Sequence, residues 1–303
     1  MKHRSKFLLT TLSLATLAAP ALAQDAAEGE APAEGEAAAP AEGEAAPAAA
    51  PPAEEAPAAA GQGIGPFTKD SYPAALINRP LTLPAGMIEV RPALQYLKLS
   101  IPDPLAGTSG SSSATGLAVG AGYGITDKIE AGLSTGLGID PDVEWSESLG
   151  LYGAYSLHDT AKMDIAPSVS TALNFADGAD VLSGFSIGAG FRYLISDKLF
   201  ARAGNNLLNL GIAPEVGLQL NVNAGVGFQA TPELAVAVDL NMMSIKLFGD
   251  AVPDSTFFDP FGLTLTGLYA ISNKIDAYAQ VLLPSIADAA DFYGLSVGAN
   301  IRL

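Results

Sequence analysis

The stretch Ala121–Leu133, AGYGITDKIEAGL, indicates the fold of the chain. Apolar and small residues alternate strictly on both sides of the polar turn Thr126-Asp127-Lys128, which is the pattern of a β-hairpin. One face carries Tyr123, Ile125, Ile129, Ala131 and Leu133, whereas the other is glycine with the single charge of Glu130. Because a packed core of glycine would be nearly empty, the pattern fits an apolar face against lipid and a glycine face lining a lumen.

Similar hairpins recur along the chain and allow its strands to be counted. The further turns are Ser196-Asp197-Lys198, Thr231-Pro232-Glu233, Ser272-Asn273-Lys274 and the longer His158–Lys162. We expect Asp and Asn to cap these turns. Five turns predict ten strands, and strands at about 87–99 and 292–303 bring the total to twelve. An all-β, antiparallel, up-and-down transmembrane barrel is therefore predicted over 87–303.

Longer polar segments connect the hairpins at the other end of the predicted barrel. They are 101–114, 140–147, 176–182, 204–216, 246–260 and 286–291. Short turns at one end and long loops at the other are typical of outer-membrane barrels. The seventh strand is irregular, because Asn205-Asn206 and Leu207-Leu208 break the alternation that begins at Leu199.

Three segments precede the barrel. Residues 1–23 combine a basic start, a short apolar core and the site Ala21-Leu22-Ala23, which predicts a signal peptide. Residues 24–60 are rich in Ala, Pro and Glu and lack aromatic residues, which predicts a disordered spacer in the periplasm. Residues 61–86 form a proline-rich leader. Two interpretations of the leader remain open: Arg79–Pro84 docks at the periplasmic mouth, or the leader is unstructured.

Composition narrows the class of protein. The chain of 303 residues has a formal charge of −17 and no cysteine. The negative charge argues against a nucleic-acid partner, and the missing cysteine excludes disulfides and a lipid anchor on cysteine. No apolar run reaches the roughly 18–20 residues that a membrane helix needs. Strands would therefore have to cross a membrane.

Aromatic residues support the same topology. Tyr123, Tyr155, Tyr193, Phe228 and Tyr269 lie on the lipid-facing parity, each two residues before the last apolar position of its strand. They predict a ring at the membrane interface near the short turns, where amphipathic rings are favoured.

The opposite parity carries charges close to the short turns. We take as lumen or constriction candidates Glu89, Arg91, Glu130, Asp164, Arg192, Arg202, Asp276 and Arg302. Two interpretations remain open for this belt. It selects solutes by charge at a constriction, or it is a salt-bridge network that closes the base of the barrel.

The remaining motifs are weaker. The long loops are acidic, which would concentrate cations at that mouth. Asp140, Asp142 and Glu144 offer alternating oxygen ligands for calcium but lack the spacing and glycine of an EF-hand loop, so ordinary solvated loops are the default. Beyond the signal peptide the sole histidine is His158, in a short turn with no strand-borne serine beside it. We expect no enzymatic activity and no cofactor.

Two motifs resemble known families. Tyr293–Leu303 alternates to the last residue and resembles the C-terminal strand by which the barrel assembly machinery recognises Gram-negative outer-membrane proteins, although Leu303 stands where those proteins usually have Phe or Trp. The stretch GYGITDKIEAGL is similar to hairpins of porin-like transporters of the phenol-degradation-pathway type. The resemblance implies a barrel in outer-membrane lipid that passes small solutes. With the acidic loops, it predicts a pore that favours cations; the alternative is a closed structural barrel that displays these loops.

Overall fold

The computed structural model describes residues 67–103, 108–140, 143–160, 162–204, 207–212, 216–249, 256–285 and 292–303. The expected signal peptide 1–23, the spacer 24–60 and the first part of the leader lie outside the described residues. No helix among the described residues is long and apolar enough to cross a membrane.

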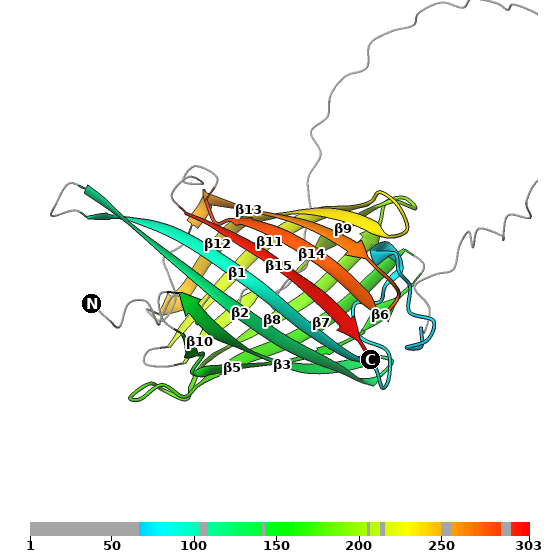
Figure 1. Ribbon diagram of the computed structural model, residues 1–303, viewed down its shortest axis with the longest axis horizontal. Coiled ribbons are helices and arrows are strands. Elements are labelled where there is room, and N and C mark those ends of the chain that lie inside the picture. The colour runs from blue at the N-terminus through cyan, green and yellow to red at the C-terminus, as the bar shows by residue number, and fades with distance from the viewer. Residues whose placement is uncertain are drawn as a thin grey trace, which may run out of the picture. The chain divides into compact units, whose positions relative to one another are not determined.

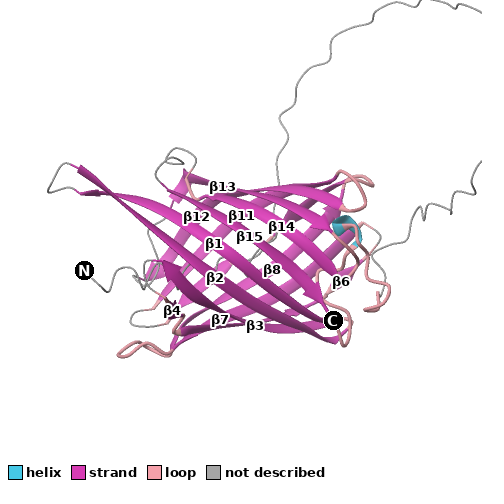
Figure 2. Ribbon diagram, in the orientation of Figure 1, coloured by secondary structure: helices cyan, strands magenta, loops and turns pink. Residues whose placement is uncertain are grey.

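The described chain is almost entirely β-structure (Figure 2). The strands are β1 (Ile88–Asp103), β2 (Thr108–Thr126), β3 (Ile129–Asp140), β4 (Glu144–Trp145), β5 (Ser148–Tyr155), β6 (His158–Asp159), β7 (Met163–Asn174), β8 (Leu182–Leu194), β9 (Leu199–Ala203), β10 (Leu208–Gly211), β11 (Gly217–Gln229), β12 (Leu234–Gly249), β13 (Thr256–Ala270), β14 (Ile275–Leu283) and β15 (Phe292–Arg302). One 3-10 turn, η1 (Leu76–Asn78), precedes them within the described part.

The strands close into an antiparallel barrel. The order of pairing follows the sequence, with β3 pairing β5, β5 pairing β7, and β9 and β10 both lying between β8 and β11, and β1 pairs with β15 from Glu89↔Arg302 to Leu99↔Phe292. Figure 1 shows β15 lying beside β1, with the C-terminus at the end that holds the short turns. The two-residue strands β4 and β6 add no position, and β9 and β10 occupy one, so the barrel has twelve strand positions. The predicted fold and strand number are confirmed.

The seventh strand is interrupted, as its irregular sequence indicated. The segment β9 pairs with β8 and β11 near the short turns, and β10 pairs with the same two strands farther along. Gly204 between them has φ +98°, a conformation that glycine adopts readily. A side chain there would meet the carbonyl oxygen of Ala189, so the chain passes close to β8 at the interruption.

The two faces of the wall differ as the alternation predicts. In the β2–β3 hairpin Tyr123, Ile125 and Leu133 are exposed on the outside, while Glu130 is buried on the inside. Exposed large apolar side chains also occur on β1, β7, β8, β11, β12, β13 and β15. A barrel with an apolar exterior and a polar interior is the reverse of a soluble protein and is typical of strands that cross a membrane.

The short turns are capped by hydroxyl groups rather than by Asp or Asn, so that detail of the expectation is wrong. Thr126, Ser196, Thr231 and Ser272 stand first in their turns. The Oγ atom of Ser196 accepts the amide of Leu199 at 3.1 Å, and that of Ser272 accepts the amide of Ile275 at the same distance. The two threonines accept equivalent amides at 3.0 and 3.1 Å. Side-chain oxygens at this position are common turn caps.

Three of the expected long connections are shorter than predicted. The strands β1 and β2 continue to Asp103 and from Thr108, and β12 and β13 extend into 246–260. The expected connection 204–216 contains β10. Pairing between β1 and β2 continues through the Ser and Thr residues of 108–115 as far as Asp103↔Thr108, so these strands run beyond the apolar band that the alternation marks.

Candidate functional site

The interior holds a cavity of about 470 Å³ bounded by the barrel wall and by the leader. Its neutral wall residues with inward hydroxyl or amide groups are Ser134, Ser168, Ser170, Ser186, Asn209, Thr266, Gln280 and Asn300. Aromatic rings of Tyr152, Phe200 and Tyr278 complete the wall. A cavity of this size is in the range that binds small molecules.

The leader lies inside the end of the barrel that holds the short turns. Tyr72, Ile77 and Leu83 are buried, and Tyr72 and Leu83 pack with Met87 in one apolar cluster. Pro73, Pro80 and Pro84 exclude a regular helix and favour extended backbone. Of the two interpretations of the leader, docking is the one that the described residues 67–86 show.

Glycines of the β2–β3 hairpin make room for the leader. A Cβ atom on Gly124 would lie 2.0 Å from the carbonyl oxygen of Pro84 and 2.6 Å from that of Leu83. A Cβ atom on Gly122 would lie 3.1 Å from the Leu83 side chain. The amide of Gly86 also donates to the Gly124 carbonyl at 2.8 Å, and the amide of Gly124 donates to the Met87 carbonyl at 2.9 Å. The glycine face therefore contacts the leader backbone.

Carboxylates hold alternate backbone amides of the leader. The amide of Leu81 donates to Asp164 Oδ2 at 2.9 Å, and that of Leu83 donates to Glu130 Oε2 at 2.9 Å. The amide of Ala85 donates to Asp127 Oδ1 at 3.1 Å. Farther back, the amide of Ile77 donates to Gln229 Oε1 at 3.1 Å. Hydrogen bonds to an ionised acceptor are stronger than those between neutral groups.

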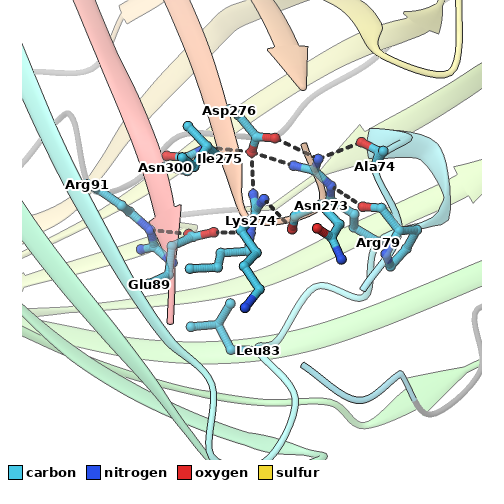
Figure 3. Close-up of polar contacts among 12 residues, drawn as sticks. Ala74, Arg79, Leu83, Glu89, Arg91, Asn273, Lys274, Ile275, Asp276 and Asn300 are labelled. Atoms are coloured by element: carbon cyan, nitrogen blue, oxygen red, sulfur yellow. Dashed lines mark hydrogen bonds and ion pairs between the residues drawn. The ribbon is translucent and has the colours of Figure 1, made fainter. Parts of the chain in front are cut away.

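Arg79 anchors the leader to strand β14. Its Nη1 donates to Asp276 Oδ2 at 2.6 Å and its Nη2 to Asp276 Oδ1 at 2.8 Å, a bidentate pair in which both side chains are buried (Figure 3). Its remaining donors reach the carbonyls of Pro73 at 2.9 Å and Ala74 at 2.5 Å. The pair between Arg79 and Asp276 joins residues that are 197 positions apart in the sequence.

The ring of Tyr72 lies beneath two guanidinium groups. Arg302 is 4.8 Å and Arg79 5.5 Å from its centroid, at distances typical of cation–π contacts. Burial raises the pKa of Tyr72 to about 12, and the negative charge of Glu89 adds to this rise while both arginines oppose it. The phenol is therefore neutral at ordinary pH.

The other arginines of the wall also form ion pairs. Arg302 pairs with Asp276 and, at 2.7 Å, with Glu89. Arg192 pairs with Asp164 at 3.3 Å and donates to the leader carbonyls of Leu76 and Arg79.

A second group surrounds Glu130. Arg91 pairs with Glu89 at 2.7 Å and with Glu130 at 3.2 Å, and the hydroxyl of Tyr152 donates to the same carboxylate. Arg202 stands apart from this group and pairs with Asp239 at 2.7 Å. All eight predicted lumen residues thus lie on the inner face, and seven of them belong to the network around the leader. A role for them in solute selection remains a prediction.

Several residues of the site were not among the candidates. Arg79 and Tyr72 come from the leader, Tyr152 from β5, and Asp239 from farther up β12. Of these residues, the sequence singled out only Arg79, as the first residue of the segment Arg79–Pro84 in the docking interpretation.

The predicted aromatic ring lies on the outer surface. Tyr123, Tyr155, Tyr193, Phe228 and Tyr269 are each between 41% and 53% exposed. Their position on the apolar exterior fits the expected interface ring, whose contact with headgroups remains a prediction.

The remaining candidates gain no support. Asp142 lies outside the described residues, and the described part contains no group of three or more His, Cys, Asp or Glu side chains that could hold a metal ion. His158 and Asp159 pair with the start of β7 in the short turn. Both residues are exposed there.

Comparisons with known proteins complete the description. No protein-family model and no curated protein matches the chain. Among solved structures, the chain is similar to a "KdgM porin" at 10% identity, with 71% of this chain and 98% of that chain covered and a TM-score of 0.45. A "NanC porin" matches at 9% identity, 71% and 100% coverage and a TM-score of 0.47. An outer membrane channel from Pseudomonas putida F1 matches at 13% identity, 73% and 97% coverage and a TM-score of 0.40. The barrel architecture itself rests on the strand pairings.

Proposed function

We propose that the chain is an outer-membrane channel for passive passage of small solutes. The observation that carries the proposal is the cavity of about 470 Å³, whose wall carries hydroxyl, amide and charged side chains among apolar ones, inside a barrel with large apolar side chains exposed on its exterior. An apolar exterior suits lipid, and a polar interior suits water and hydrogen-bonding solutes. The closed strand pairing leaves no sheet edge in the bilayer.

The docked leader defines the alternative. A leader that fills the base permanently would make the barrel a closed structural element that displays its acidic loops. The two functions differ in whether the base can be vacated. Wall arginines stay paired with the acids at the base, Arg302 with Asp276 and Arg192 with Asp164, so the leader can leave without stranding a buried charge, and this favours the channel.

We further propose a modest preference for cations. The ion pairs on the inner wall balance one another, so selectivity would arise at the mouth formed by the long loops. Asp140, Glu144, Glu147, Asp177 and Asp180 lie at that end. Acidic residues around an opening raise the local concentration of cations.

Conductance in planar lipid bilayers tests the channel. The variant Arg79→Glu places a carboxylate against Asp276 and should release the leader, so this full-length variant is expected to show unit conductance steps. In that background Ser168→Phe should lower the unit conductance, because Ser168 lines the cavity. Its neighbour provides a matched control: Val169→Phe should leave the conductance unchanged, because Val169 is 49% exposed on the outside.

One result would contradict the channel proposal. If inserted barrels of the parent chain and of Arg79→Glu both stay silent, the structural alternative is correct. The reversal potential across a salt gradient tests the cation preference. It should shift toward the cation equilibrium potential and lose that shift at high ionic strength, where loop charges are screened.

A further inference from the structure

We propose that the base of the barrel is a peptide-binding site whose ligand is this chain's own segment Phe67–Gly86. The segment binds reversibly and closes the passage while it is bound. The closing effect rests on the proposed channel function, whereas peptide binding stands without it.

The site binds the peptide backbone through a ladder of carboxylates. Alternate amides of the segment, at Leu81, Leu83 and Ala85, each donate to a different acidic side chain of the barrel. Alternate spacing is that of an extended strand, whose successive amides point to opposite sides. Proline at 80 and 84 leaves the donating positions free and restricts the unbound conformations, which lowers the entropy lost on binding.

Side chains provide specificity. The guanidinium of Arg79 makes a bidentate pair with Asp276, a geometry that lysine cannot reproduce. The side chains of Tyr72 and Leu83 are buried with Met87 at the barrel entrance. Two barrel arginines also contact the segment. Arg192 donates to two leader carbonyls, and Arg302 lies over the Tyr72 ring.

Three of the carboxylates keep a cation when the peptide leaves, and this supports reversible binding. Asp276 is also paired with Arg302, Asp164 with Arg192, and Glu130 with Arg91. A buried charge without a partner would be strongly unfavourable. Because barrel arginines already compensate these acids, the vacated base retains its ion pairs and the barrel can stay folded.

Glycine geometry shows that the site is shaped for a backbone. Gly124 lies so near the segment that a Cβ atom would overlap the carbonyl of Pro84. The inner face of the barrel also offers a contrasting position at Gly294, where an added Cβ atom would meet Leu282 at an ordinary 3.5 Å. At Gly124 the atoms nearest to such a Cβ belong to the segment's own backbone, so this position has room for the segment only because it is glycine.

Binding in trans tests the proposal. A fluorescent synthetic peptide of residues 67–86 is titrated into full-length Arg79→Glu protein in detergent, and anisotropy gives the affinity. The native peptide should bind saturably, and a peptide carrying Arg79→Glu should bind at least about tenfold more weakly, since charge-assisted hydrogen bonds are lost. The parent protein should bind the native peptide far more weakly than the variant, because its own segment competes at high effective concentration.

Equal affinity of the two peptides, or no saturable binding of the native one, would overturn the proposal. Heat-modifiable gel mobility checks that the barrel is folded, and Arg79→Gln replaces Arg79→Glu if it is not. Because anisotropy requires no current, saturable binding with silent bilayers would refute the channel and leave the peptide site standing. Conductance steps without specific peptide binding would refute the peptide site and leave the channel standing.

Discussion

At the scale of single residues, the inner wall is organised by acids that serve two partners. Asp276 accepts from Arg79 of the leader and Arg302 of β15. Glu130 accepts from the Leu83 amide, Arg91 and Tyr152. Each acid therefore links the leader to the wall, and its removal should affect docking before it affects the barrel.

The variant Glu130→Gln should weaken docking of the leader. Loss of the ionised acceptor should cost about 1–2 kcal/mol of docking free energy. Hydrogen exchange of the Leu81, Leu83 and Ala85 amides measures this change, because their protection reports local opening. The control Glu147→Gln makes the same chemical change at an exposed position of the opposite end and should leave protection unchanged. Equal protection in both variants would contradict the assigned contact.

Alkaline pH should release the leader through Tyr72. Its pKa is about 12 when docked and 10.0 in its ordinary state, so the contribution of the neutral phenol to docking is fully present below pH 10 and declines as pH rises toward 12. At pH 11 the docking constant should be about tenfold lower. Glu89, Glu130, Arg79 and Arg302 are the charged groups that face the phenol.

The line shape of a nitroxide label at Ala75 reports docking without depending on pH. Tyr72→Phe keeps the ring under the guanidinium groups but cannot ionise, so this variant should remain docked through the same pH window. Identical release of the parent and the variant would show that another group controls it.

At the scale of elements, the β2–β3 hairpin is the platform on which the leader docks. Its glycines admit the leader backbone, and its Asp127 and Glu130 accept two leader amides. Alternation in Ala121–Leu133 correctly predicts the hairpin and the direction of each face. The occupant of the glycine face could not be predicted, because its contacts come from a segment whose prolines exclude regular structure without specifying a path.

The variant Gly124→Ala should displace the leader with the charges unchanged. The added methyl group overlaps the Pro84 carbonyl, so protection of the Leu83 and Ala85 amides should fall by at least about tenfold. The control Gly294→Ala lies on the same inner surface with only ordinary contacts and should leave protection intact. A docked leader in Gly124→Ala would show that the backbone does not pass where the structure places it.

Strand positions were predictable to the extent that they are periodic. The inward and outward faces of β5, β8 and β14 follow from alternating apolar residues. The broken pattern at Asn205-Asn206, which lie outside the described residues, predicted loop at the top of the seventh strand, whereas strand structure resumes there as β10. Strand ends were less predictable, since Ser and Thr at the start of β2 give no apolar signal. Hydroxyl caps in the turns were missed because Asp and Asn beside them offered the same chemistry.

At the scale of the whole molecule, one barrel combines an apolar exterior, a cavity with polar side chains in its wall, and a leader that occupies one end. The eight predicted lumen charges lie on the inner face, and the two interpretations of their role are related. Seven of them form ion pairs around the leader, whereas Arg202 pairs with Asp239 apart from it, and a role in solute selection remains a prediction. Solute passage would then require the leader to leave.

The most direct measurement crosslinks the leader to the barrel and then releases it in the same protein. The chain has no cysteine, so a pair introduced at Ala85 and Asp127, whose amide and carboxylate are 3.1 Å apart, can be joined uniquely by a short reducible thiol crosslinker. Bilayer conductance is recorded before and after reduction in the Arg79→Glu background. We predict silent barrels while the crosslink holds and unit conductance steps once it is reduced. Equal conductance in the two states, or silence in both, would contradict the account.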